Sequence, residues 1–275
     1  MPLSAIRTGT VKEVLPAEET AAAVAAIGRG EPVAAAGVPE DDQGVDAILR
    51  LLRDEYAIDF SHYKMSTVTR RIERRLALNR SLDLDMYLEQ LRSDPRELSS
   101  LYEDLLIGVT RFFRDDEAFE ALEKRVLPEL VERAAPDEPI RVWVPGCATG
   151  QEAYSIAMLL HEALAARRRP LNVKILATDV HKASLEVARS GLYSEEHLAG
   201  IPSPRLQRFF TLKPNGYQIS QTLRECIVFA PHNLLRDAPF TKLDLITCRN
   251  LLIYFQPHAQ KTVLSLFHFG LKPGG

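Results

Sequence analysis

The stretch that decides the fold reads Arg141-Val-Trp-Val-Pro-Gly146-Cys-Ala-Thr-Gly-Gln-Glu152-Ala-Tyr-Ser-Ile-Ala-Met158. Its first residues are apolar and typical of a buried strand, which ends at the Pro-Gly pair. A loop of small residues follows, and from Glu152 onward apolar residues recur at helical spacing. Strand, glycine turn and helix predict the first unit of a doubly wound α/β sheet. In such a sheet, ligands bind where the carboxyl end of the strand meets the start of the helix.

The acid at the rim of this loop narrows the kind of ligand. A pyrophosphate cradle favours backbone N–H groups and positive charge. Glu152 instead offers a carboxylate, which suits a cationic group such as an ammonium or a sulfonium. We therefore expect S-adenosylmethionine in this site rather than a dinucleotide.

A second acid, Asp179, ends the next predicted strand, which covers residues 173–178. A carboxylate at this place can accept both ribose hydroxyls of an adenosine. It can also cap the helix predicted to begin near His181. The glycine loop one strand earlier favours the ligand interpretation.

Composition and charge exclude several classes of protein. The 275 residues are 46% hydrophobic and 26% charged, which gives room for one large or two ordinary globular domains. A formal net charge of −3 argues against a general nucleic-acid binder or a protein of anionic membranes. The three cysteines and seven histidines lack metal-ligand spacing, and no apolar run is long enough to span a bilayer. We expect a cytoplasmic protein without a metal site or membrane insertion.

The chain divides into four segments by pattern. Residues 1–30 form a small remnant, 31–45 a linker, 46–130 a helical domain and 131–275 the α/β domain. Apolar stripes in the helical domain include Ile72, Leu76, Leu78 and Met86. Strands are predicted at 140–144, 173–178, 226–230 and 243–247, with a β-hairpin inserted at about 207–224 around Asn215-Gly216. Turn chemistry at 272–275 predicts that the sheet is truncated at its C-terminal end.

The segment Thr110-Arg-Phe-Phe-Arg114 lies at the junction of the two larger predicted domains. We assign Phe112 and Phe113 to packing, since aromatic pairs at a domain seam usually fill it. Arg114 can hold a carboxylate, either of the cofactor or of an acidic substrate.

Two further segments follow later strands. In Asn233-Leu-Leu235, the side-chain amide and backbone can read an adenine edge, or the asparagine serves an ordinary turn. Cys248-Arg-Asn-Leu-Leu-Ile-Tyr254-Phe255 puts Arg249 and Asn250 at the binding edge of the sheet. Tyr254 is either part of the site or a half-buried core tyrosine.

A basic helical face carries Arg70, Arg71, Arg74 and Arg75 at i, i+4 spacing. It is either a solvated face that pairs with nearby acids or a docking surface for an acidic protein helix.

Together these motifs resemble the chemotaxis receptor methyltransferases, the CheR family, over residues 46–275. The resemblance implies a Rossmann-like fold and S-adenosylmethionine-dependent methyl esterification of glutamates on receptor signalling helices, by a monomeric protein. By position, it places cofactor contacts at Thr110, Arg114, Glu152, Asp179, Asn233, Leu234, Cys248 and Arg249. It puts Tyr254 near the reacting centre beside Arg114 and Arg249, the basic face against the receptor, and the hairpin in the family's β-subdomain.

The first thirty residues resemble a different family, the tail of a CheB-type receptor methylesterase, so we expect a fragment of a CheB–CheR fusion. Three positions depart from the methyltransferase pattern. Gly108 stands where some members have a cofactor-contacting asparagine, and Ala148 and Gln151 replace the usual serine and first glutamate.

Two rival functions remain on sequence grounds. Methyl transfer to a small molecule or nucleic acid requires a general base or a broadly positive cleft, and the acidic isoelectric point counts against the latter. The other alternative is a truncated, non-catalytic module that binds receptor or cofactor.

Overall fold

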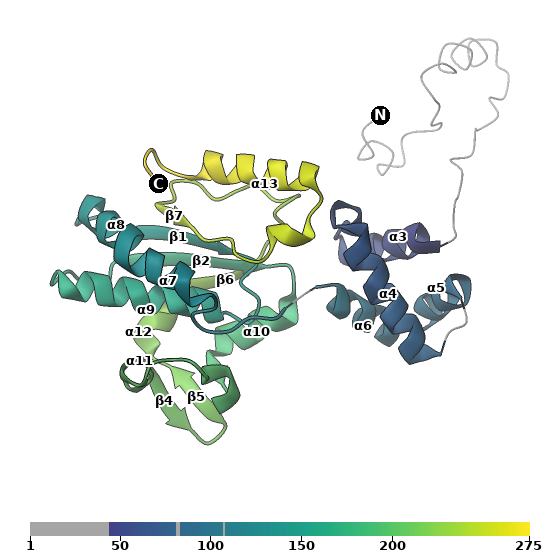
Figure 1. The fold of residues 1–275 in the computed structure, drawn as a ribbon, viewed down its shortest axis with the longest axis horizontal. Helices are drawn as coiled ribbons and strands as arrows, with labels where there is room; N and C mark the ends of the chain where they lie inside the picture. The colour runs from purple at the N-terminus through teal and green to yellow at the C-terminus, as the bar shows by residue number, and fades with distance from the viewer. Residues whose placement is uncertain (1–43, 81–82, 107) are drawn as a thin grey trace, which may run out of the picture.

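The structure is a computed structural model that describes residues 44–80, 83–106 and 108–275. A group of helices lies beside a parallel sheet, to which a small antiparallel sheet is attached (Figure 1). The predicted methylesterase-like tail and nearly all of the predicted linker lie outside the described residues. Within the described ranges, none of the helices has the length and apolar character needed to cross a bilayer.

The helical module, residues 44–106, consists of α3 (Gly44–Tyr56), α4 (Met65–Asn79), α5 (Leu84–Ser93) and α6 (Pro95–Leu105). Asp83 and Asp94 begin α5 and α6, because their side chains accept the otherwise unpaired N–H groups of Met86 and Arg96. The apolar faces of the helices share one core, which includes Ile48, Leu52, Ile72, Leu91 and Leu101.

Two residues of the predicted apolar stripes are exposed, so the prediction was wrong for them. Leu78 keeps 61% and Met86 53% of its surface accessible. Leu78 follows Leu76 by two positions, about 200° around the helix, and therefore cannot share its face. Met86 directly precedes Tyr87 and Leu88 in α5, so it does not lie on the face of the helix that buries those two residues.

The main sheet has the order β6-β2-β1-β7, and all its strands are parallel. These are β1 (Ile140–Pro145), β2 (Val173–Asp179), β6 (Ile227–Pro231) and β7 (Leu245–Ile246). The helices α9 (Gln151–Ala166), α10 (Lys182–Ser190) and α13 (Pro257–Gly270) follow β1, β2 and β7. The strand order reverses at β1, where doubly wound sheets bind ligands. The predicted fold class is confirmed, although β7 is shorter than expected.

The helices between the module and the sheet belong to the sheet. They are α7 (Asp116–Ala121), a π-helical turn (Leu122–Val126) and α8 (Leu127–Arg133). Phe119, Leu127 and Val131 are buried in the same core as β1 and α9. The periodicity placed residues up to 130 with the helical domain, but the two hydrophobic cores separate before Thr110.

The predicted hairpin is present as β4 (Phe210–Lys213) and β5 (Gly216–Ile219), paired antiparallel. A third strand, β3 (Leu192–Tyr193), pairs with β5, so the small sheet begins earlier than the predicted insert. The short helices α11 (Ser203–Phe209) and α12 (Gln221–Glu225) flank it. The ring of Phe112 packs edge-on against Tyr193 and Phe210, at centroid distances of 5.0 and 5.5 Å. This confirms its predicted packing role.

Candidate active site

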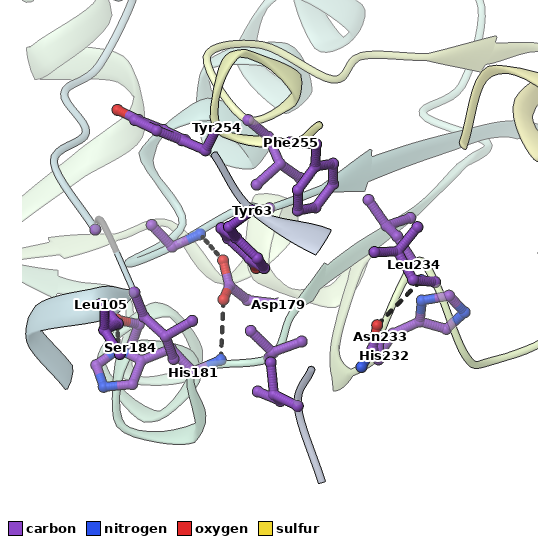
Figure 2. Close-up of a pocket in the computed structure, with 18 of the residues that line it drawn as sticks. Tyr63, Leu105, Asp179, His181, Ser184, His232, Asn233, Leu234, Tyr254 and Phe255 are labelled. Atoms are coloured by element: carbon purple, nitrogen blue, oxygen red, sulfur yellow. Dashed lines mark hydrogen bonds between the residues drawn. The ribbon is translucent and has the colours of Figure 1, made fainter. Parts of the chain in front are cut away.

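A cavity of about 730 Å³ lies at the carboxyl edge of the main sheet, between the sheet and the helical module. Figure 2 shows part of its lining. The loops after β1, β2, β6 and β7 contribute one wall, and α3 with the turn at Phe60–His62 contributes the other. Seven of the eight sequence-predicted cofactor residues line it, as does Tyr254: Thr110, Arg114, Glu152, Asp179, Asn233, Leu234 and Arg249.

The glycine loop after β1 has little freedom to move or to accept larger residues. Gly146 and Gly150 both have a positive φ, +68° and +94°. A Cβ on Gly146 would lie 2.8 Å from the Leu251 side chain, and one on Gly150 would lie 2.8 Å from Cβ of Ala188. Glycine is therefore required at both positions to fit the loop between α10 and the segment after β7.

The Asp179 carboxylate holds both the glycine loop after β1 and the turn that leads into α10. Its Oδ2 accepts the N–H of Ala148 at 2.8 Å, and its Oδ1 accepts the N–H of His181 at 2.9 Å (Figure 2). Burial raises the pKa of this carboxyl, and the two backbone donors lower it in part. A carboxylate has lone pairs for more than one hydrogen bond per oxygen, so these contacts leave it able to accept ribose hydroxyls. The N-cap of α10 is His181, and no side chain accepts an N–H of its first turn, so the prediction that Asp179 caps this helix was wrong. The ligand interpretation stays a prediction.

Glu152 carries a buried charge with little compensation. Its side chain is 15% exposed, and its Oε1 is buried without a hydrogen-bond partner among the described residues. Its Oε2 lies 3.8 Å from Nη1 of Arg249, which is too far for a hydrogen bond. Burial raises the pKa of Glu152 to about 7, and the charge of Arg249 offsets this only in part. A cationic ligand fits this carboxylate, because it would supply the missing partner.

Arg249 is held by a residue that the sequence reading missed, Asp115. The guanidinium Nη2 donates to Oδ2 of Asp115 at 2.7 Å and to the carbonyl of Arg114. It also lies over the ring of Phe119, 4.8 Å from its centroid. Asp115 has a φ of +60°, a left-handed conformation that aspartate tolerates better than most residues. The sequence offered one indication of this role, namely that Asp115 is an acidic residue directly after Arg114.

Arg114 and Tyr254 line the cavity from two different loops, one before α7 and one after β7. Arg114 is half-buried, and its Nη1 donates to the carbonyl of Val109 at 2.7 Å. Tyr254 is half-buried, and its carbonyl accepts the N–H of Lys64 from the helical module at 2.8 Å. Both side chains line the cavity, so the predicted catalytic group of Arg114, Arg249 and Tyr254 is brought together.

The segment after β6 contributes Asn233 and Leu234. Oδ1 of Asn233 accepts the N–H of Leu235 at 3.0 Å, as in an asparagine turn. Leu234 is 6% exposed and also lines the cavity. The turn role and the adenine-edge role are therefore both compatible with this geometry.

Cys248 is the predicted cofactor contact that the cavity does not include. Its side chain packs against the core formed by Trp143 and α13. Burial raises the pKa of its thiol to about 12. The residue lies next to Arg249 in the chain, but its side chain serves packing on the other side.

The basic face of α4 is split into two pairs. Arg75 donates to both carboxylate oxygens of Glu97, and its side chain is only 17% exposed. Arg71 donates to the carbonyl of Asp104 on α6. These two arginines hold the helical module together, which corrects their assignment to a docking surface. Arg70 and Arg74 are exposed and remain candidates for it.

Two family models match the chain, one for each of its parts. The family described as "CheR methyltransferase, SAM binding domain" matches residues 108–275, and "CheR methyltransferase, all-alpha domain" matches 43–106. The chain belongs to the CheR methyltransferase family. The predicted cofactor, S-adenosylmethionine, is the one this domain binds.

Three relatives show how the chain compares in length. It is 30% identical to a chemotaxis protein methyltransferase of Borreliella burgdorferi over 82% of both chains. It is 32% identical to chemotaxis protein methyltransferase 2 of Vibrio cholerae, over 79% of this chain and 77% of that one. An uncharacterized 104.1 kDa protein of Rhodobacter capsulatus is 40% identical over the whole chain, which spans only 32% of that protein.

Proposed function

We propose that this chain transfers the methyl group of S-adenosylmethionine to glutamate carboxylates of chemotaxis receptors, and that it acts in the cytoplasm as a monomer. The observation that carries the proposal is that Glu152 and Asp179 line one cavity together with Arg114, Arg249 and Tyr254. Two acids and two guanidiniums in one cleft suit a cofactor with an ammonium and a carboxylate, and an anionic substrate.

The reaction itself requires little acid–base chemistry. A glutamate is already ionised near pH 7, because its ordinary pKa is about 4.3. When bound, S-adenosylmethionine supplies an activated methyl group on a positively charged sulfur. The substrate carboxylate oxygen forms the new bond to the methyl carbon as the carbon–sulfur bond breaks, so no proton is transferred.

The residues of the chain then serve alignment and charge. Glu152 holds the ammonium of the methionine part, and Asp179 holds the ribose. Arg249 and Arg114, with Tyr254, replace the water that two carboxylates lose on entering the cleft, that of the cofactor and that of the substrate. Orientation and exclusion of water of this kind can contribute roughly 7–11 kcal/mol in well-aligned systems.

We propose that the receptor helix lies against the exposed side of α4, with Arg70 and Arg74 facing its acidic residues. Arg71 and Arg75 are excluded from this surface by their contacts within the module. An exposed ion pair contributes little to binding free energy, so Arg70 and Arg74 would mainly speed and orient the approach of the receptor.

Methyl transfer tests the proposal directly. Tritiated S-adenosylmethionine is incubated with the chain and an acidic receptor signalling fragment, and base-labile methanol is counted as the ester product. Asp179→Ala is expected to abolish binding of S-adenosylhomocysteine in calorimetry and to stop transfer. Asp137→Ala, at an exposed acid away from the cavity, serves as the control.

Three results would contradict parts of the proposal. Base-stable label in nucleic acid would indicate the other enzyme class. Cofactor binding without transfer to the receptor fragment would favour a non-catalytic module. Unchanged affinity in Asp179→Ala would remove Asp179 from the cofactor site.

A further inference from the structure

A short segment of the helical module is paired with the loop that carries Tyr254. The N–H of Lys64 donates to the carbonyl of Tyr254 at 2.8 Å, and the N–H of Gln256 donates to the carbonyl of His62 at 2.8 Å. Between them, Tyr63 and Phe255 form an antiparallel bridge. The helical module is therefore joined by backbone hydrogen bonds to the catalytic side of the cavity.

The ring of Tyr63 is fixed by aromatic neighbours on both sides. It packs edge-on against Phe255 at 4.9 Å between centroids, and in a tilted arrangement against Phe60 at 5.2 Å. Phe60 and Phe255 are themselves buried, 0% and 3% exposed. Because aromatic contacts of this geometry restrict the ring, the phenol hydroxyl has a defined direction.

Asp179 is close enough to Tyr63 for its charge to act on the phenol. Figure 2 shows Tyr63 between Tyr254 and Phe255 on one side and Asp179 on the other. All four residues line the same cavity. Burial raises the pKa of the Tyr63 phenol above its ordinary value, and the nearby negative charge of Asp179 raises it further. The hydroxyl therefore keeps its proton near neutral pH and is a hydrogen-bond donor.

A ribose held by Asp179 matches this donor. When a ribose hydroxyl donates to a carboxylate, its own oxygen remains free to accept a hydrogen bond. Both oxygens of Asp179 also hold backbone N–H groups, so the carboxylate is fixed in place beneath Tyr63. A donor opposite the carboxylate would complete the hydrogen bonding of the sugar.

We propose that Tyr63 donates a hydrogen bond from its phenol to a ribose oxygen of the cofactor, so that the helical module is part of the cofactor site. The proposal rests on the assignment of the ribose to Asp179. The cofactor then connects the two parts of the molecule, and its binding tightens the backbone pairing of residues 62–64 with 254–256.

Calorimetry with S-adenosylhomocysteine on the full chain tests the contact. Tyr63→Phe removes only the hydroxyl, and a neutral hydrogen bond of about 0.5–1.5 kcal/mol corresponds to a Kd about two- to tenfold higher. Tyr56→Phe is the matched control, because Tyr56 stacks on Tyr102 in the same aromatic cluster but does not line the cavity. It should leave the Kd unchanged, and circular dichroism should show both variants folded.

Deoxy analogues identify the partner of the hydroxyl. One of the two analogues, 2′-deoxy- or 3′-deoxy-S-adenosylhomocysteine, lacks the oxygen that accepts from Tyr63. With that analogue the wild type and Tyr63→Phe should bind equally. An unchanged Kd in Tyr63→Phe, or a loss that persists with both analogues, overturns the proposal. The ribose assignment is tested separately: Asp179→Ala should lose the affinity that the wild type has for S-adenosylhomocysteine. Failure of the Tyr63 contact can therefore be told from failure of the Asp179 assignment.

Hydrogen exchange provides a second readout. S-adenosylhomocysteine should slow exchange of the Lys64 and Gln256 amides in the wild type. In Tyr63→Phe the same amides should gain clearly less protection at saturating ligand. Equal protection in both proteins would show that Tyr63 does not connect the cofactor to the helical module.

Discussion

Glu152 makes the strongest quantitative prediction, because its charge is buried and only partly compensated. Burial raises its pKa to about 7. Relative to an ordinary glutamate, ionisation in the free protein therefore costs about 3.5 kcal/mol. A cofactor ammonium beside the carboxylate would favour the ionised form and lower this pKa. Binding must then release a proton whenever the free protein holds Glu152 protonated.

The sign of the pH dependence follows from this. With a pKa of about 7, Glu152 is about 3% ionised at pH 5.5 and about three quarters ionised at pH 7.5. The affinity for S-adenosylhomocysteine should therefore rise about twentyfold over this range, with close to one proton released per ligand at pH 5.5. Calorimetry in two buffers of different ionisation enthalpy measures both quantities.

Glu152→Gln is the matched variant, since it keeps the size of the side chain and removes the charge. A hydrogen bond to a charged group contributes about 1.5–3 kcal/mol, so the variant should bind roughly ten- to hundredfold more weakly at pH 7.5. Its affinity should vary much less between pH 5.5 and 7.5, and it retains His62, His181 and His232 in the cavity lining. The same pH slope in variant and wild type would assign the proton to another group and refute the reasoning.

Two further substitutions test the supports of the site and of the helical module. Asp115→Asn removes the charge that holds Arg249, and kcat for methyl transfer should fall by up to about fivefold, in keeping with an exposed ion pair. An unchanged kcat would deny Asp115 a positioning role. Arg75→Met leaves Glu97 buried without its cation and should lower the free energy of unfolding in urea by about 3 kcal/mol. Arg74→Met, at an exposed position, should change the free energy of unfolding by less than about 0.5 kcal/mol. Equal effects of the two substitutions would contradict the assignment of Arg75 to the stability of the helical module.

The features that the sequence predicted well are those determined by neighbouring residues. The strand, glycine turn and helix around Gly146 and Glu152 form a continuous segment, and the hairpin depends on the turn at Asn215-Gly216. Asp179 was placed because it ends a strand, and the carboxyl ends of parallel strands meet at one edge. Local pattern and sheet geometry were sufficient for these.

Contacts between distant segments could not be predicted in this way. Arg75 pairs with Glu97, which lies on another helix, and no spacing rule links the two. Helical periodicity placed residues up to 130 in the helical domain, without showing that Leu127 packs on the sheet rather than in the helical module. Cys248 follows β7 beside Arg249, and only the path of the chain shows that it turns into the core.

Tyr63 was missed for the same reason. It lies in a short connection before α4, a place where an aromatic residue usually signals packing. Its position over Asp179 depends on pairing with residues 254–256, almost two hundred positions later in the chain. Only the folded structure brings the two together.

The buried polar atoms of Glu152 and Arg249 favour a ligand that carries both a positive and a negative group. Oε1 of Glu152 and Nη1 of Arg249 are both buried, and neither has a hydrogen-bond partner among the described residues. Leaving a buried polar group unpaired costs about 1–3 kcal/mol, and more for a charged one. A ligand with an ammonium and a carboxylate on one carbon offers a partner of the correct sign to each. The methionine end of S-adenosylmethionine has this pair of groups, whereas a pyrophosphate would pair with the arginine alone and place its charge beside the acid.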